Sequence, residues 1–285
     1  MACPVHASQL NKVATVFTLP IQKLAFAKNG NFVVAHASSI QIQINGMPSA
    51  CKSTQGNKMK FGGLQKLTLL DYPNKMACTV FTVGCNFRCP FCHNNSLVCN
   101  GVDLLSEKEI LAFLAKRKNV LEGMCLTGGE PLLQNDVAVF LTEVKKLGYL
   151  VKLDTNGANP TKLKQLVALG LVDYVAMDIK NCKRLYNQTA GVDVDIDAIC
   201  QSVDFLKSGV VDYEFRTTVT GNLHNETSID EMGQWLVGAK VVYLQQFVDS
   251  GDLVDPTTTG CDEATLKHYQ AILQQYLPNV QLRGI

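Results

Sequence analysis

Strong charge of one sign and long apolar runs are both missing from this chain of 285 residues. Its 26 Lys and Arg residues nearly balance its 25 Asp and Glu residues, so the formal net charge is +1. No basic stripe is interleaved with aromatic residues, and nothing in the sequence indicates nucleic-acid binding. No stretch approaches the roughly 20 uninterrupted apolar residues that a membrane-spanning helix needs. We therefore expect a protein that binds neither nucleic acid nor membranes.

A regular disulfide framework is missing as well. The eleven cysteines are an odd number at irregular spacings, which fits a reducing compartment better than a set of disulfides. The apolar residues 13–21 faintly resemble a signal peptide, but Pro20, Gln22 and Lys23 interrupt the pattern. We expect a cytoplasmic protein.

The sequence pattern changes near residue 59. Residues 1–58 are poor in helix signals and mix small with polar residues, and residues 41–45 alternate as one isolated strand would. We leave the structure of this N-terminal extension unassigned and expect it to be dispensable. Residues 59–285 alternate apolar runs of strand length with helical patterns, which predicts βα units and a parallel sheet in one domain.

Six strands and six helices can be placed in residues 59–285. The strands span residues 77–82, 123–126, 150–154, 172–177, 213–219 and 240–245. The helices span residues 106–116, 136–147, 161–168, 196–207, 229–237 and 261–276. Two helix starts are marked, because Ser106 and Glu109 form a capping box and Asn159 precedes a first-turn proline. Six βα units are too few to close an eight-stranded barrel, so we expect an α/β fold with an open, partial (β/α)6 barrel.

Three cysteines stand in one short segment, with the spacing C-x3-C-x2-C at Cys85, Cys89 and Cys92. Three thiolates can hold three corners of a cubic iron–sulfur cluster and leave the fourth iron open to bind a substrate. Four-cysteine runs instead close a cluster for electron transfer. The sequence therefore indicates an iron–sulfur cluster with one open iron.

On spacing alone, three alternatives to a cluster remain open for this segment. A zinc site usually shows two C-x2-C pairs or a cysteine pair with a histidine pair, and here only one such spacing occurs, followed directly by His93. A redox pair of Cys89 and Cys92 needs the context of a thioredoxin-like βαβ unit and leaves Cys85 unexplained. A chance cluster in a chain with eleven cysteines is the third alternative.

Chemically distinctive motifs stand at the ends of four consecutive predicted strands. The cysteine segment follows the first strand, and Thr-Gly-Gly-Glu-Pro at 127–131 follows the second. Asp-Thr-Asn-Gly at 154–157 ends the third strand, and Met-Asp-Ile-Lys at 177–180 ends the fourth. Singly, such motifs are ordinary turn formers or surface pairs. Because ligands gather at the carboxyl ends of parallel strands, the four together predict one binding site.

These motifs resemble those of a known family. The cysteine spacing is the signature of the radical S-adenosylmethionine (SAM) enzymes. Residues 59–285 resemble activating enzymes of the pyruvate formate-lyase activase type, many of which are identified as anaerobic ribonucleoside-triphosphate reductase activating proteins. The most specific parts are residues 62–73 and 84–94. Residues 59–65 look like the start of such a chain, which is why we treat residues 1–58 as an extension.

The resemblance implies a [4Fe–4S] cluster and SAM as cofactors. It assigns Cys85, Cys89 and Cys92 as the cluster ligands and catalytic residues, with the open iron chelated by the amino and carboxylate groups of SAM. Phe91 resembles the aromatic residue that packs against the adenine, although an ordinary core phenylalanine is the alternative.

Further SAM-binding residues are implied at the strand ends. The resemblance places Gly128, Gly129 and Glu130 facing the SAM amino group, where glycines permit close backbone approach and a carboxylate accepts from an ammonium-like donor. Five more residues would surround the SAM carboxylate. Asp154, Thr155 and Asp178 would hold a monovalent cation, and Lys180 and Arg216 would complement the carboxylate directly.

The resemblance also implies an activity. A reduced cluster passes one electron to SAM, and the resulting 5′-deoxyadenosyl radical takes a Cα hydrogen from a glycine of a partner protein. The protein would position the reactive carbon and exclude solvent. The expected partner is a glycyl-radical enzyme, foremost an anaerobic ribonucleoside-triphosphate reductase, and the electron donor is a low-potential protein such as a flavodoxin or ferredoxin.

Two rival functions are kept. A radical SAM enzyme acting on a small molecule, similar to a deazapurine synthase, would keep the cofactors and change the substrate. A non-catalytic zinc-binding module would lack the brown colour of an iron–sulfur protein.

Overall fold

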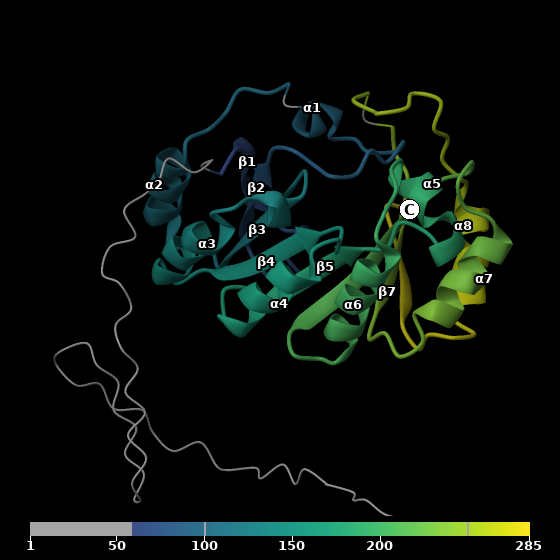
Figure 1. Cartoon of the computed structure of the whole chain (residues 1–285). Coiled ribbons are helices and arrows are strands. Elements are labelled where there is room, and N and C mark those ends of the chain that lie inside the picture. Colours follow the sequence, from purple (N-terminus) through teal and green to yellow (C-terminus); the bar gives the residue numbers. More distant parts are fainter. Residues whose placement is uncertain (1–58, 100, 250) are drawn as a thin grey trace, which may run out of the picture. The chain divides into compact units, whose positions relative to one another are not determined.

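One eight-stranded sheet organises the computed structural model, which describes residues 59–99, 101–249 and 251–285. The strand expected at residues 41–45 lies outside these residues. β1 pairs antiparallel with β2, and all later neighbours pair in parallel. The strands lie side by side in sequence order (Figure 1): β1 (Phe61–Thr68), β2 (Ala77–Thr82), β3 (Gly123–Gly128), β4 (Leu150–Thr155), β5 (Tyr174–Asp178), β6 (Asp212–Val219), β7 (Val242–Gln246) and β8 (Val280–Arg283).

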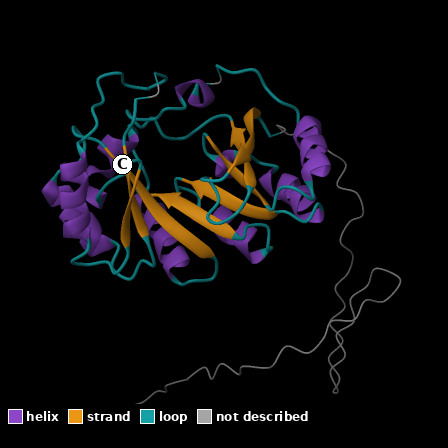
Figure 2. Cartoon of the chain, turned by 180° about the vertical axis from the view of Figure 1, so that it is seen from behind, coloured by secondary structure: helices purple, strands orange, loops and turns teal. Residues whose placement is uncertain are grey.

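Helices fill the connections between the parallel strands. Figures 1 and 2 show the longer helices along the outside of the curved sheet. Two 3-10 turns, Pro131–Leu133 and Lys183–Leu185, lie in the loops. The helices are α1 (Asn95–Val98), α2 (Glu107–Arg117), α3 (Val137–Lys146), α4 (Pro160–Ala168), α5 (Tyr186–Ala190), α6 (Ile196–Lys207), α7 (Glu226–Trp235) and α8 (Glu263–Leu273).

The marked helix starts are made by the residues that the sequence suggests. The Glu109 backbone N–H donates to the Ser106 hydroxyl at 3.3 Å, and the Ser106 N–H donates to the Glu109 carboxylate at 2.8 Å, which completes the capping box of α2. The Asn159 side chain accepts from the Lys162 N–H at 3.0 Å at the start of α4. These contacts satisfy backbone donors that the first turn of a helix leaves unpaired.

All six predicted strands are present, with ends shifted by one or two residues, and all six predicted helices are present. The sheet also has two edge strands that the sequence pattern did not predict, β1 and β8. The second and third residues of β1 are Gly62 and Gly63, and glycine weakens a strand pattern. A Cβ on Gly62 would lie 2.7 Å from a methyl carbon of Val83, so this glycine permits close packing. β8 has only four residues.

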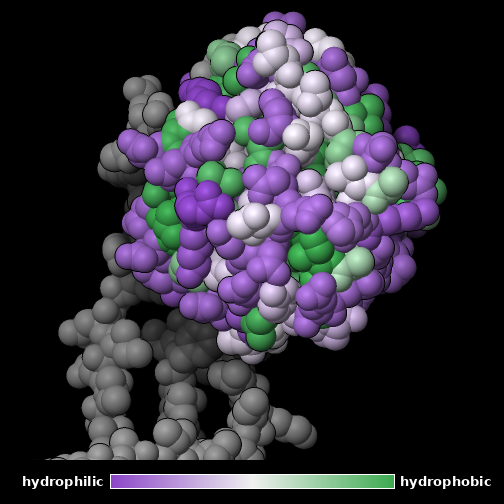
Figure 3. Space-filling model, turned by 90° about the vertical axis from the view of Figure 1, so that its right-hand side faces the viewer, coloured by the Kyte–Doolittle hydropathy of each residue, from purple (hydrophilic) through white to green (hydrophobic). Residues whose placement is uncertain are grey.

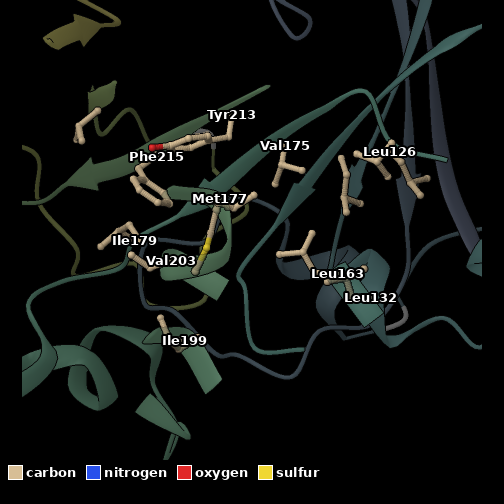
Figure 4. Close-up of a cluster of buried hydrophobic side chains, with 14 of the residues drawn as sticks. Leu126, Leu132, Leu163, Val175, Met177, Ile179, Ile199, Val203, Tyr213 and Phe215 are labelled. Atoms are coloured by element: carbon tan, nitrogen blue, oxygen red, sulfur yellow. The ribbon is translucent and has the colours of Figure 1, made fainter. Parts of the chain in front are cut away.

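The main core lies between the sheet and the outer helices. Leu126 of β3 and Met177 of β5 face Leu163 of α4 and Val203 of α6 (Figure 4), and all four are fully buried. Burying such a side chain contributes about 1.5–3 kcal/mol relative to leaving it exposed. Because parallel strands are covered on both faces, β2 and β3 consist mostly of buried residues.

The side of the domain near α7 and α8 is largely hydrophilic, with apolar residues only in small groups (Figure 3). No helix in residues 59–99, 101–249 and 251–285 combines the length and apolar character that crossing a bilayer requires. The parallel pairing of β2 to β8 directs the carboxyl ends of these strands to one edge of the sheet.

Candidate active site

A cavity of about 230 Å³ lies at the carboxyl ends of the central strands. Every site residue expected from the sequence lines it, although the residues come from five separate segments of the chain. They are Cys85, Cys89, Phe91, Cys92, Gly128, Gly129, Glu130, Asp154, Thr155, Asp178, Lys180 and Arg216. The fold therefore brings these residues together, and their individual roles stay predictions.

The cysteine segment is held by backbone contacts with α5. The Arg88 N–H donates to the Ala190 carbonyl at 2.8 Å. Gly191 has a positive φ of 69°, and a Cβ there would lie 2.7 Å from the carbonyl carbon of Arg88. The Arg88 guanidinium donates to the carbonyls of Cys85 and Phe87, both at 2.7 Å. The segment is thus fixed by its backbone, which leaves the cysteine thiols for another partner.

The three thiols line the same cavity but differ in exposure. Cys89 is buried, and Cys85 and Cys92 are half-buried. Burial raises the pKa of Cys85 to about 12, although a hydrogen bond from the Phe87 backbone N–H partly offsets this increase. Burial likewise raises the pKa of Cys89, while the positive charge of Lys180 opposes the shift. The thiols bind an iron–sulfur cluster as thiolate anions. Three thiols beside a cavity and near the positive charge of Lys180 are suited to that role.

The described residues contain no group of three or more His, Cys, Asp or Glu side chains arranged to hold a single metal ion. The three thiols therefore do not converge on one point, as a mononuclear zinc site requires. A cubic cluster binds each thiolate at a separate iron, so its ligands need to surround a cavity rather than a point. The donor set fits a cluster better than a single zinc ion.

Gly128, the last residue of β3, and Gly129 pack closely against the end of β2 and the residues that follow it. A Cβ on Gly129 would lie 2.6 Å from the carbonyl carbon of Gly84, and a Cβ on Gly128 would lie 2.9 Å from the carbonyl carbon of Phe81. The Gly129 N–H donates to the Thr82 carbonyl at 2.9 Å. Because these residues have no side chains, the Gly-Gly turn can pack directly on the start of the cysteine segment. The glycines therefore have a packing role that does not depend on a ligand.

Glu130 is almost completely buried, with 2% of its surface exposed. Its carboxylate accepts from the backbone N–H groups of Leu132 at 3.0 Å and Asn156 at 2.7 Å, and from the Thr155 hydroxyl at 2.7 Å. Burial raises its pKa to about 7, although these hydrogen bonds favour the charged form. Glu130 therefore links the ends of β3 and β4 within the protein.

A chain of ion pairs crosses the floor of the cavity. Arg216 of β6 contacts Asp154 at 3.1 Å and Asp178 at 3.0 Å, and Lys180 contacts Asp178 at 3.1 Å. Lys152 of β4 pairs with the other oxygen of Asp154. Both aspartates and the Thr155 hydroxyl, the three expected cation ligands, are thus engaged by protein groups.

The charges in this chain are stabilised mutually. Burial alone would raise the pKa of Asp178, but Lys180 and Arg216 outweigh burial and hold it at about 2. Burial opposes the charge on Lys180, but Asp178 outweighs it and the pKa is raised. Burial would raise the pKa of Asp154 as well, but Arg216 and Lys152 lower it. Asp154, Asp178 and Lys180 are therefore charged at neutral pH.

Further contacts at the site were not predicted. Lys180 lies over the Phe91 ring at 5.7 Å, which fixes an aromatic face beside the cysteines. The loop after β7 crosses the cysteine segment, where Asp252 accepts from the Ser96 hydroxyl at 2.7 Å and the Asp255 N–H donates to the Pro90 carbonyl at 2.9 Å. No local sequence signal marks such long-range contacts. Lys152 was also missed, although it stands two residues before Asp154 on one strand.

Comparisons with known proteins agree with this geometry. The family model described as "Radical SAM superfamily" matches residues 79–236. The chain belongs to this superfamily. Radical SAM enzymes combine a [4Fe–4S] cluster with SAM, so membership implies both cofactors here.

Two relatives from Methanocaldococcus jannaschii are named as glycyl-radical enzyme activating enzymes. One is 29% identical over 238 residues, which cover 80% of this chain and 97% of that protein. The other is 26% identical over 226 residues, which cover 77% of this chain and 85% of that protein. Among solved structures, SuiB of Streptococcus suis bound to S-adenosylmethionine matches with a TM-score of 0.57 and 16% identity, over 71% of this chain and 48% of that one. This last likeness concerns the fold alone.

Proposed function

We propose that this radical SAM enzyme activates a glycyl-radical enzyme by taking a Cα hydrogen from one of its glycines. The observation that carries the proposal is the similarity to an M. jannaschii protein with that name, which extends over 97% of the relative's length. A likeness restricted to the cofactor-binding half would support only the shared cofactor chemistry. We further propose an anaerobic ribonucleoside-triphosphate reductase as the partner, as the sequence motifs suggest.

We assign the binding roles from the position and charge of each residue. Cys85, Cys89 and Cys92 would hold the cluster at the cavity wall. Arg216 and Lys180 would attract the carboxylate of SAM, because their side chains line the cavity and remain positively charged. When bound, the cluster and SAM would supply a carbon-centred radical that abstracts hydrogen.

The segment around Gly128 would present backbone to the amino end of SAM, with Glu130 behind it. Glu130 already accepts three hydrogen bonds from the protein, so we assign it first to holding this turn in place and second to attracting the amino group. Phe91 would cover the adenine, supported by its place beside Lys180. The loop after β7 would limit access of water, because Val254 lines the cavity.

We also propose a cytoplasmic enzyme that is reduced by a low-potential flavodoxin or ferredoxin. All nine cysteines in the described residues are free, as a reducing compartment requires. A monovalent cation beside the SAM carboxylate, which the resemblance suggests, has less support, because its expected ligands already have partners in the protein.

Isotope transfer tests the substrate class. The reduced enzyme with SAM is incubated with the reductase, in which glycine is deuterated at Cα. We expect deuterium in 5′-deoxyadenosine and a glycyl radical in the electron paramagnetic resonance spectrum of the reductase. The radical signal should be a doublet with unlabelled reductase, split by the remaining Cα hydrogen, and should collapse toward a singlet with the deuterated reductase. The Cys92→Ala enzyme should give neither signal, whereas the Cys99→Ala enzyme should give both, because Cys99 is exposed and does not line the cavity.

Different results would separate the rivals. Deuterium that arrives only from a labelled purine-like compound, without a glycyl radical, would favour the small-molecule enzyme. A colourless protein that retains zinc after anaerobic preparation would favour the non-catalytic module. A glycyl radical formed on a different glycyl-radical enzyme but not on the reductase would keep the activity and reject the proposed partner.

A further inference from the structure

Lys152 is a buried lysine with no place in the roles assigned so far. Only 1% of its side chain is exposed, although it stands in the middle of β4. Side chains alternate along a strand, so Lys152 and Asp154 share one face, while Val151 and Leu153 pack into the hydrophobic core on the other. Lys152 does not line the cavity, whereas Asp154 does. The lysine therefore lies beneath the cavity floor.

The ammonium group of Lys152 is committed to Asp154. Among the described residues, Asp154 is the carboxylate within ion-pair distance of it. The buried carboxylate of Glu214, two strands away on β6, is instead held by Arg283 at 2.8 Å and by the Tyr174 hydroxyl at 3.0 Å. On the other side, the register partner Cys125 places its sulfur 3.8 Å from the ammonium nitrogen. Burying an ammonium is costly unless a charge partner is present, so the Asp154 carboxylate is what stabilises Lys152 in its buried position.

Lys152 decides the net charge of this chain of ion pairs. Lys152, Lys180 and Arg216 contribute three positive charges, and Asp154 and Asp178 contribute two negative charges, which leaves a net charge of +1. Without Lys152 the same chain of ion pairs would be neutral. A site that binds a carboxylate needs a surplus of positive charge, and in this chain the surplus depends on the buried lysine.

We propose that the Lys152 ammonium takes the place of a bound sodium or potassium ion. It pairs with the Asp154 carboxylate and thereby makes SAM binding independent of sodium or potassium. Asp154 then serves to hold Arg216 toward the SAM carboxylate. The inference rests on the proposed position of that carboxylate, and it replaces the cation expected from the sequence. Lys152 acts through Asp154 and Arg216, so it is a positioning residue.

Cation dependence of SAM binding tests this inference. Labelled SAM is equilibrated with the cluster-loaded, full-length enzyme without reductant, so that no cleavage occurs. Binding is measured at one ionic strength in tetramethylammonium, sodium and potassium chloride. We expect the wild-type dissociation constant to be the same in all three salts. We expect Lys152→Met to bind SAM roughly tenfold or more weakly in tetramethylammonium, equivalent to about 1.4 kcal/mol, and to recover in sodium or potassium.

Two matched variants control for charge and for packing. Lys152→Met combined with Asp154→Asn removes the unpaired carboxylate and restores the net charge of +1. Its SAM affinity can fall because Arg216 loses one partner, but it should be the same in all three salts. Lys145→Met removes a different lysine–aspartate pair beside β4, at 2.7 Å from Asp173 and away from the cavity, and it should bind as the wild type does. Iron content and thermal unfolding of each variant show whether it folds and holds the cluster.

Each outcome decides for or against the inference. Wild-type binding that requires sodium or potassium overturns it, as does Lys152→Met binding with unchanged affinity in tetramethylammonium. A weak Lys152→Met variant that no cation rescues would show a purely structural role and overturn it too. Should Lys152→Met fail to fold, the wild type and the double variant decide, since cation dependence in either contradicts the inference. A wild-type enzyme that binds no SAM in any salt would overturn the proposed SAM site itself.

Discussion

Replacing Gly129 by Ala should damage both the stability of the domain and the cluster site. A Cβ at this position would lie 2.6 Å from the carbonyl carbon of Gly84 and 3.2 Å from its nitrogen. The obstacle is backbone rather than a flexible side chain, so the strand ends must separate. That movement weakens the hydrogen bonds from Gly129 N–H to Thr82 and from Glu130 N–H to Gly84, at 2.9 and 2.8 Å.

The size of the effect follows from these contacts. Overpacking costs about 1–3 kcal/mol, and a backbone obstacle places Gly129→Ala near the upper limit. Each weakened hydrogen bond adds about 1 kcal/mol, so we expect a loss of roughly 3–5 kcal/mol in the free energy of unfolding. Because Gly84 directly precedes Cys85, iron content after anaerobic reconstitution should fall as well.

Chemical denaturation of the cluster-free protein and iron analysis of the reconstituted protein measure the two effects. Gly101→Ala is the matched control, because a Cβ there would meet its nearest neighbour at 3.6 Å, an ordinary contact distance. It should change the free energy of unfolding by less than about 0.5 kcal/mol. A Gly129→Ala protein within about 1 kcal/mol of the wild type, with full iron content, would refute the packing argument.

Two more predictions concern the extension and Glu130. A chain that starts at Met59 should be soluble and bind a full cluster, because residues 59–285 contain all eight strands of the described sheet, and an insoluble or iron-free product would contradict this. The folded pKa of Glu130, about 7, lies above its ordinary value of 4.5, so its contribution to stability should be lost as pH rises from 4.5 through 7. Denaturation from pH 4.5 to 8 should show Glu130→Gln gaining stability relative to the wild type with rising pH, and a constant difference between the two proteins would contradict the raised pKa.

The sequence was sufficient to place the parallel strands and the edge where the site lies. The predicted strands are apolar because helices or the interior cover both faces, so their pattern reflects burial directly. The motifs after these strands meet because parallel strands share one carboxyl edge. The sequence pattern did not predict β1 and β8, because edge strands are less covered and tolerate glycine and polar residues. Gly62 and Gln281 are examples.

The chain of ion pairs could be predicted only in part. Asp154, Asp178 and Arg216 stand at strand ends or inside a strand next to motifs, which marks them as site residues. A lysine inside a strand ordinarily indicates a solvent-facing position, and the sequence gives no sign that Lys152 faces a buried aspartate. Its partner lies two residues away in the sequence, but its burial results from the curvature of the whole sheet and from neighbouring strands.

The Gly-Gly-Glu motif shows why loss of activity alone cannot assign a ligand-binding role here. Gly129 packs against Gly84, and Glu130 accepts hydrogen bonds from Leu132 in the following 3-10 turn and from Thr155 and Asn156 at the end of β4. A substitution at Gly129 therefore disturbs the start of the cysteine segment, and one at Glu130 disturbs the loops after β3 and β4, even if neither residue touches SAM. Measurements that separate the two effects are SAM affinity at full iron content and stability without the cluster. If Glu130→Gln lowers stability but leaves the SAM dissociation constant unchanged, Glu130 holds the turn and the amino group of SAM is bound by the backbone.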